Sequence, residues 1–287
     1  MKIIESQSRR LLSKIRTCIF KHSLPGILGH KSPVAYPNFI INGIKFVKNL
    51  KQINDFSLIY LNGEWICNVQ GLKFVLNSAE DLFILNEVFI NGIYNVDIKS
   101  PFIFIDVGMN VGITSLFFAN KSGCKKVVAF EPFKRTLSLA MKNLTINNVA
   151  CKIQVNKMGL GYPTRTITVN YSEEYKGSVG INGIAPYISK IKDVRQEQLS
   201  IIDAFEVLND YANEKMILKI DCEGSEYEIV ERLHDTGLLS HFDVIMMEWH
   251  LKGPALLREI LLDNNFEILS MGEHNINTGI LYAFRKS

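Results

Sequence analysis

The chain has 287 residues, of which 47% are hydrophobic and 21% are charged, and its formal net charge is +3. A chain of this length and composition buries the core of one large domain, or of one domain with a small appendage, which excludes a wholly disordered protein. Its basic residues do not cluster with aromatic ones, so we expect no nucleic-acid partner. The five cysteines form no Cys-x-x-Cys pair, which indicates neither a zinc knuckle nor a disulfide framework and favours a reducing, cytoplasmic location.

The N-terminal residues 1–20 predict a basic amphipathic helix, because Arg9, Arg10, Lys14 and Arg16 alternate with aliphatic residues. Such a helix packs one face on the body of the protein, which is the commoner case, or makes a peripheral contact with an anionic membrane surface. No stretch of the sequence approaches the roughly 18 apolar residues that a membrane-spanning helix requires. We therefore expect no transmembrane span.

Residues 23–77 are irregular and rich in proline and glycine at first, and then contain short apolar runs such as 39–41 and 65–67. They predict a linker followed by a small set of antiparallel strands. We accordingly divide the chain into an N-terminal extension, residues 1–77, and a main domain, residues 78–287.

From residue 78 onward, helical and strand patterns alternate. The run Phe102–Ile105 is apolar throughout, which is typical of a strand buried on both faces. Further strands are expected at 126–130, 152–155, 216–220 and 244–247, and helices at 81–93, 111–120, 225–233 and 254–262. This alternation predicts βαβ units and hence a doubly wound α/β fold with a mostly parallel sheet.

The end of the chain has a different pattern. Two strand-like runs, 266–270 and 280–284, are joined by a loop too short for a crossover helix, so they must pair antiparallel. A mostly parallel, seven-stranded sheet with a C-terminal antiparallel hairpin is the Rossmann-like arrangement of class I methyltransferases rather than of dehydrogenases.

The loop after the first buried strand carries candidate ligand-binding residues. Here Asp106, Gly108, Asn110 and Gly112 lead directly from the strand into a helix. Glycines allow the sharp turn and the close approach of a ligand, and the amides at the helix N-terminus favour a carboxylate. Asp106 is placed to bind the ammonium group of a methionine moiety, whereas it would repel a pyrophosphate. The loop therefore favours S-adenosylmethionine over a dinucleotide.

The second strand ends in Glu131, followed by Pro132. An acid at this point of a βαβ unit accepts hydrogen bonds from the hydroxyls of a bound ribose. Dinucleotide-binding proteins have the same acid, so Glu131 alone does not identify the cofactor. The loop does, because it has Gly108-x-Asn110-x-Gly112 in place of Gly-x-Gly-x-x-Gly.

A second group of polar residues follows the strands at 216–220 and 244–247. Asp221 and Glu223 come after the first of these strands, and Glu248 and His250 after the second, at the edge where open α/β sheets bind ligands. Glu248 and His250 point the same way if the strand continues. His250 suits a general base for a hydroxyl substrate, while a divalent metal held by Asp221, Glu223 and Glu248 is an alternative. Structural roles, such as acids that complement a helix dipole, remain open.

These segments resemble the FkbM methyltransferases. The resemblance rests on residues 104–112, on Ala129–Pro132, on 218–226 and on Glu248–His250, and it extends over about residues 78–285. It implies methyl transfer from S-adenosylmethionine to a hydroxyl-bearing acceptor, commonly a sugar, a glycan or a related metabolite. Two other functions stay open from the residues alone: an NAD(P)-dependent oxidoreductase and a noncatalytic nucleoside-binding protein.

Overall fold

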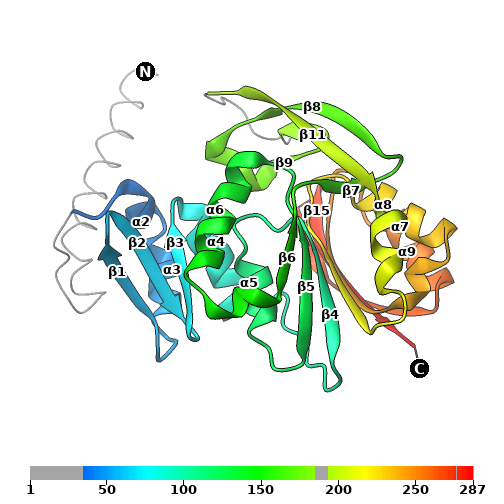
Figure 1. Cartoon of the computed structure of the whole chain (residues 1–287), viewed down its shortest axis with the longest axis horizontal. Coiled ribbons are helices and arrows are strands. Elements are labelled where there is room, and N and C mark those ends of the chain that lie inside the picture. The colour runs from blue at the N-terminus through cyan, green and yellow to red at the C-terminus, as the bar shows by residue number, and fades with distance from the viewer. Residues whose placement is uncertain (1–34, 185–192, 276, 287) are drawn as a thin grey trace, which may run out of the picture. The chain divides into compact units, whose positions relative to one another are not determined.

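The computed structural model of the chain describes residues 35–184, 193–275 and 277–286, with the side chains of 173–175 and 270–275 left out. The chain divides into two compact units at the boundary between Ile93 and Tyr94 (Figure 1). The predicted boundary between residues 77 and 78 thus lies inside the first unit. The predicted N-terminal helix lies outside the described residues. Among the described residues, no helix is both long enough and apolar enough to cross a membrane.

The first unit contains a three-stranded antiparallel sheet and several short helices. The sheet consists of β1 (Ser57–Leu61), β2 (Glu64–Val69) and β3 (Leu72–Leu76). The turn between β1 and β2 is Asn62-Gly63, and both residues have positive φ angles, 52° and 86°, as tight hairpin turns require. The helices are α2 (Asn38–Asn42), α3 (Ile44–Leu50), α4 (Ala79–Asn86) and the π-helix η1 (Glu87–Asn91).

One expectation for this unit was wrong, because the apolar run 39–41 forms helix α2 and not a strand. The reason is visible in the residues that follow. Ile40, Ile44, Val47 and Leu50 are all buried, and their spacing of three or four residues is that of one helical face. A run of three apolar residues is too short to distinguish a strand from the start of such a helix.

The second unit is built on a mostly parallel sheet of seven strands. Its order is β14-β15-β13-β12-β4-β5-β6, and β15 is antiparallel to both of its neighbours. The parallel strands are β4 (Phe102–Val107), β5 (Cys124–Phe130), β6 (Ile153–Asn156), β12 (Met216–Ile220) and β13 (Phe242–His250), and the last two are β14 (Phe266–Asn275) and β15 (Thr278–Arg285). The predicted doubly wound sheet is therefore confirmed.

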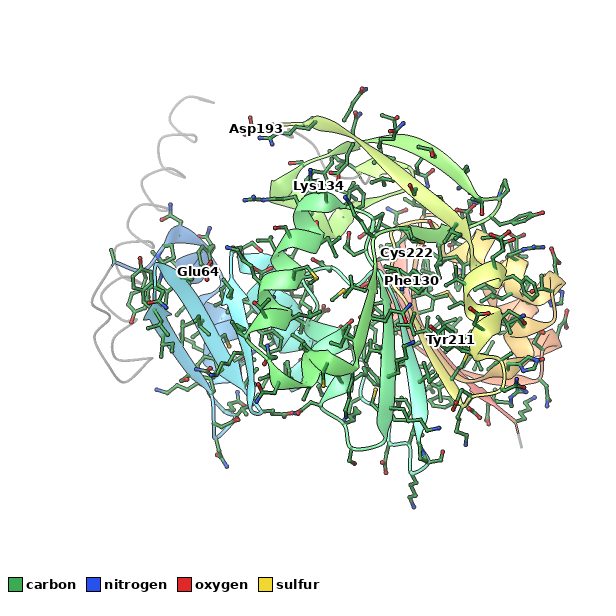
Figure 2. All side chains as sticks on the ribbon, viewed as in Figure 1. Glu64, Phe130, Lys134, Asp193, Tyr211 and Cys222 are labelled. Carbon is green, nitrogen blue, oxygen red and sulfur yellow. The ribbon has the colours of Figure 1, made fainter. Side chains whose placement is uncertain are left out.

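Helices cover both faces of this sheet, and the side chains of β4 show how. Ile103 and Ile105 belong to the hydrophobic core formed with α7 (Ala204–Leu208), α8 (Glu226–Asp235) and α9 (Ala255–Asp263). Phe104 points the other way and stacks on Phe118 of α5 (Ile113–Ala119), with ring centroids 3.6 Å apart. Helix α6 (Lys134–Thr145) follows β5. Figure 2 shows Phe130 within the sheet and Lys134 at the start of α6.

An additional β region, which the sequence patterns did not predict, lies between β6 and α7. It contains a three-stranded sheet in the order β7-β11-β8 and the short hairpin β9-β10. The strands are β7 (Gly159–Gly161), β8 (Arg165–Tyr171), β9 (Val179–Gly180), β10 (Gly183–Ile184) and β11 (Arg195–Asp203), and the 3-10 helix η3 (Glu173–Ser178) connects β8 to β9. The remaining 3-10 helices are η2 (Asn148–Lys152), η4 (Asn209–Tyr211) and η5 (Leu238–His241).

This additional region is attached to helix α8 by two ion pairs. Arg165 on β8 donates to both carboxylate oxygens of Glu228 at 2.9 Å. Arg232 on α8 binds Asp203 at the end of β11, with the shortest distance 2.6 Å. Arg232 donates from two of its nitrogen atoms, and paired donors of this kind fix orientation as well as distance. Helix α8 therefore holds the additional region and, through its first residue Glu226, part of the site described next.

Candidate functional site

The loop between β4 and α5 can be formed only with glycine at position 108. Gly108 has a φ of 82°, and a Cβ built on it would lie 1.7 Å from the carbonyl oxygen of Asp221. Both the positive φ and the contact exclude a larger side chain. Gly112 also has a positive φ, 84°, and is the N-cap residue of α5. The backbones after β4 and β12 therefore touch.

Glu131 closes this loop from the end of β5. Its carboxylate is buried and accepts hydrogen bonds from the backbone N–H groups of Asn110, at 2.9 Å, and Phe133, at 3.0 Å. Burial raises the pKa of Glu131 to about 8, although both backbone hydrogen bonds oppose the shift. Each carboxylate oxygen can accept one further hydrogen bond, so the group can still receive two hydroxyls from a ligand.

Asp106 lies behind the loop and is fully buried. Its Oδ2 accepts a hydrogen bond from Ser115 at 2.6 Å, and its Oδ1 lies 3.2 Å from Nζ of Lys219. Lys219 also donates to the carbonyl oxygen of Gly108 at 2.6 Å. Burial alone would lower the pKa of Lys219, but the charges of Asp106 and Asp221 raise it above its usual value. The loop thus rests on a buried ion pair.

Lys219 is a site residue that the sequence interpretation missed. It is the one charged residue within β12, whose other side chains are apolar. A lysine in the middle of a strand buried on both faces needs an acid beside it, and the register pairs Lys219 directly with Asp106. The signal was present, but the neighbouring strand could not be known from the sequence. In the structure, the carboxylate of Asp106 is paired with Lys219. Contact of Asp106 with the ammonium group of a bound methionine moiety therefore stays a prediction.

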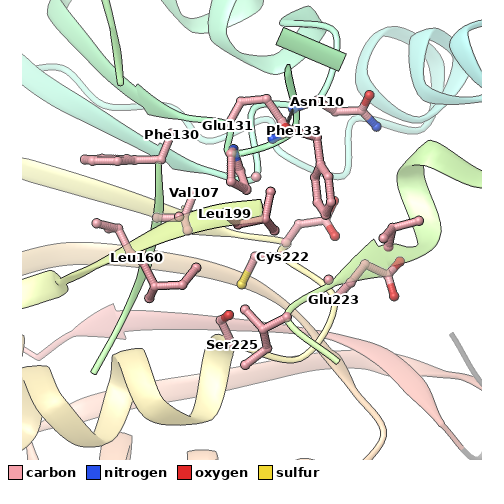
Figure 3. A pocket seen from close by; sticks show the side chains of 18 of the residues that line it. Val107, Asn110, Phe130, Glu131, Phe133, Leu160, Leu199, Cys222, Glu223 and Ser225 are labelled. Carbon is pink, nitrogen blue, oxygen red and sulfur yellow. Dashed lines mark hydrogen bonds between the residues drawn. The ribbon is translucent and has the colours of Figure 1, made fainter. Parts of the chain in front are cut away.

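A pocket opens at the carboxyl ends of β4, β5 and β12 and holds about 630 Å³ of space, its mouth included. The loop residues Gly108 and Asn110 line it together with Glu131 and Pro132. Figure 3 shows Asn110 and Glu131 on one side and Cys222 and Glu223 on the other.

The additional β region forms the remaining wall of this pocket. Leu199 and Ile201 of β11 line it, and so do Val179 and Gly180 of β9. Gly180 approaches the loop after β12 so closely that a Cβ would lie 2.0 Å from the carbonyl oxygen of Glu223. The sequence patterns gave no indication of this wall, because β9 has only two residues and β11 contains many polar ones. Pro132 and Glu131 were predicted for the site and do line it, whereas Asp106 and Gly112 do not.

At the far end of the site, His250 is bound to Glu226 within the protein interior. Oε1 of Glu226 accepts the backbone N–H of His250 at 2.6 Å and lies 3.1 Å from ring atom Nδ1. Burial favours the neutral ring, but the hydrogen bond to Glu226 and the charges of Glu223 and Asp221 outweigh it and raise the pKa of His250 to about 10. This value is far above the near-neutral pKa expected of a general base.

Two further carboxylates face the other ring nitrogen of His250. Nε2 lies 3.6 Å from Oε1 of Glu223 and 3.7 Å from Oε1 of Glu248. Burial raises the pKa of Glu223 to about 8, and burial together with the charge of Asp221 raises that of Glu248 to about 7. Asp221 completes the group, because one ligand atom each from Asp221, Glu248 and His250 lie within 4.8 Å of one another. The structure thus brings together the four residues predicted for chemistry, of which Asp221 and Glu223 line the pocket.

Fold and pocket together define a doubly wound α/β protein with a ligand site at the carboxyl edge of its sheet. The sequence model described as the methyltransferase FkbM domain matches residues 106–268, which is more than half of the chain. The chain belongs to the FkbM methyltransferase family.

Individual relatives agree with this assignment. The chain is 25% identical over 181 residues to "Methyltransferase 1" of Beauveria bassiana, covering 57% of this chain and 70% of that protein. It is 22% identical over 222 residues to "Methyltransferase sdnD" of Sordaria araneosa, covering 68% and 85%. It is also 28% identical over 197 residues to the AMB antimetabolite synthetase AmbE of Pseudomonas aeruginosa, covering 66% of this chain but 9% of that protein.

Among solved structures, the crystal structure of methyltransferase FkbM from Methylobacillus flagellatus KT is similar, with a TM-score of 0.48 and 16% sequence identity. The aligned region covers 69% of this chain and 47% of that one, so this chain spans less than half of that protein's length.

Proposed function

We propose that this chain transfers a methyl group from S-adenosylmethionine to the oxygen of a hydroxyl-bearing acceptor, which is a sugar, a glycan or a related metabolite. The observation that carries the proposal is the pocket that joins the Gly108 loop and Glu131 to the acids after β12. One end of this pocket fits a nucleoside and the other offers groups for proton removal. The family assignment supports methyl transfer as the reaction.

The nucleoside end of the pocket offers both polar and apolar groups that suit adenosine. Glu131 has two free acceptor positions for the ribose hydroxyls, and the apolar side chains of Leu160, Leu199 and Ile201 offer contact area for a purine ring. Oδ1 of Asn110 is buried and accepts no hydrogen bond from the described residues. A buried acceptor of this kind needs a donor, and a bound ligand can supply one.

The acceptor end provides the groups that the reaction requires. S-adenosylmethionine supplies a methyl group on a positively charged sulfur. When the acceptor oxygen forms its bond to the methyl carbon, the carbon–sulfur bond breaks, a thioether leaves and the hydroxyl proton must be removed. We assign removal of this proton to the group of Asp221, Glu223, Glu248 and His250, because the first two line the same pocket.

The test of the cofactor is calorimetry with S-adenosylmethionine and its demethylated product, with NAD and NADP as comparison ligands. We expect binding of the first two and no comparable heat from the dinucleotides, since the loop has Asn110 in place of a fingerprint glycine. Preferential binding of a dinucleotide would overturn the proposal. Transfer of a labelled methyl group to a panel of neutral sugars, glycans and hydroxylated metabolites then tests the acceptor class.

A further inference from the structure

Asp221, Glu248 and His250 come from the ends of two adjacent parallel strands. Glu248 and His250 are two residues apart on β13, so their side chains lie on one face, and Asp221 follows β12, the neighbouring strand. Their three ligand atoms lie within 4.8 Å of one another. Two atoms bound to one metal ion at about 2.1 Å each can be at most about 4.2 Å apart, so only a small closure is required.

The orientation of His250 is an independent observation that points to a ligand. The side chain is 2% exposed, and its Nδ1 is bound to Glu226. Within the described residues, Nε2 makes no hydrogen bond, since the nearest carboxylate oxygens, on Glu223 and Glu248, are 3.6 and 3.7 Å away. A buried histidine that is held by a carboxylate at Nδ1 and turns Nε2, free of hydrogen bonds to the described residues, toward further carboxylates has the arrangement of metal-bound histidines.

The charges around the three residues also favour a cation. Five carboxylates, those of Asp106, Asp221, Glu223, Glu226 and Glu248, lie within 4.0 Å of one of the two basic side chains Lys219 and His250. Lys219 is closer to Asp106, at 3.2 Å, than to Asp221, at 3.8 Å. Ionised carboxylates gathered in a largely buried place are costly unless protons or a cation offset their charge, and a bound cation would favour the ionised form of Glu248.

We propose that Asp221, Glu248 and His250 bind one divalent metal ion, with Glu226 as the residue that positions the imidazole. Two carboxylates and one imidazole suit Mn²⁺, which accepts both kinds of ligand. The ion displaces any proton from Nε2 when it binds. On the basis of the proposed methyl transfer, its role is to hold the acceptor hydroxyl and lower its pKa, so that the proton leaves before or as the methyl group is received.

The experiment measures Mn²⁺ binding by electron paramagnetic resonance on the full chain, freed of metal with a chelator and containing neither S-adenosylmethionine nor acceptor. We expect one bound ion per chain in the unaltered protein and a loss of affinity of at least about a hundredfold in Asp221→Asn and Glu248→Gln. These two side chains are 31% and 24% exposed, so their replacement is compatible with folding. Glu226→Gln should weaken binding about tenfold to a hundredfold, the usual effect of residues that orient a ligand.

Glu214→Gln is the matched control, because Glu214 is an exposed carboxylate paired with Lys125. It should bind Mn²⁺ like the unaltered protein. Absence of binding to the unaltered protein overturns the metal site, and so does equal binding by Asp221→Asn and Glu248→Gln. Calorimetry with S-adenosylmethionine in the presence of chelator is run on the same proteins. Failure of S-adenosylmethionine to bind would count against the proposed function alone, because the residues proposed to hold the nucleoside, Gly108, Asn110 and Glu131, include none of the three metal ligands.

Discussion

The two ends of the pocket are constructed differently. At the nucleoside end, the decisive contacts involve the backbone: Gly108 touches the carbonyl of Asp221, and Glu131 is bound by two backbone N–H groups. At the acceptor end, the contacts join side chains to one another, with His250 between Glu226 and two further carboxylates. The first end should therefore be sensitive to added atoms, and the second to changes of charge at constant shape.

The largest effect is expected from Gly108→Ala. The new Cβ would overlap the carbonyl of Asp221, and the φ of 82° is unfavourable for alanine. Each of these effects costs about 1–3 kcal/mol, so we expect a loss of about 4 kcal/mol in the free energy of unfolding. Urea denaturation measures it. Gly237→Ala is the control, since Gly237 has a φ of 74° but nothing within 4 Å of its Cβ position, and should cost about 1 kcal/mol. If the two substitutions lowered the free energy of unfolding equally, the contact between Gly108 and the carbonyl of Asp221 would not be rigid.

The second effect tests the acceptor end by a change of nearly constant shape, His250→Gln. We expect turnover to fall about a hundredfold, which corresponds to about 2.7 kcal/mol, while the affinity for S-adenosylmethionine stays nearly constant. Glutamine can still donate to Glu226 but replaces the ring nitrogen that faces Glu223 and Glu248.

His241→Gln serves as the control for this change, because His241 is exposed. Among the described residues, its side chain makes a hydrogen bond only to the backbone carbonyl of Ala212. Its kinetics should not change. If His250→Gln weakened cofactor binding as much as turnover, the two ends of the pocket would not be separable.

The same difference explains which parts of the molecule could be predicted. The parallel sheet was predictable because runs such as Phe102–Ile105 and 216–220 are apolar throughout and alternate with helical patterns. The loop glycines and Glu131 were also recognisable, because a backbone-built site imposes fixed residue types at fixed spacing. Constraints of this kind act on residues close together in the chain, so they can be recognised in the sequence.

Features that depend on neighbours distant in sequence could not be predicted in the same way. Lys219 is explained only by its register with Asp106 on the adjacent strand. The wall formed by β9 and β11 depends on the approach of Gly180 to Glu223, which no pattern within 159–203 indicates. The raised pKa of His250 likewise follows from Glu226 and Glu223, whose contact with the ring depends on how α8 and β13 pack.

The third effect concerns the nucleoside end and is somewhat smaller. Glu131→Ala removes the acceptor for the ribose hydroxyls and releases the N–H groups of Asn110 and Phe133. We expect the affinity for S-adenosylmethionine to fall by about 2 kcal/mol, roughly thirtyfold, since the two hydrogen bonds lost from the ribose contribute about 1 kcal/mol each.

Calorimetry measures this change, with Glu197→Ala as control. Glu197 also accepts a backbone N–H, that of Lys134 at 2.6 Å, but it does not line the pocket, and its replacement should leave the affinity unchanged. An unaltered dissociation constant in a folded Glu131→Ala protein would show that this carboxylate does not hold the ribose.

The smallest effect involves no loss of stability and concerns Cys222, which lines the pocket between its two ends. Burial raises its pKa well above the usual value, and the charges of Glu226 and Asp221 add to the shift. Because the thiolate is the reactive form, Cys222 should be alkylated by iodoacetamide much more slowly than the exposed Cys151 near neutral pH. Peptide mapping by mass spectrometry measures the alkylation of each cysteine separately. The same measurement on unfolded protein gives the alkylation rate of each thiol when it is not protected by the fold. Labelling of Cys222 as fast as that of Cys151 would mean that the loop after β12 opens readily, and hence that the close contact at Gly108 does not hold the two ends of the pocket together.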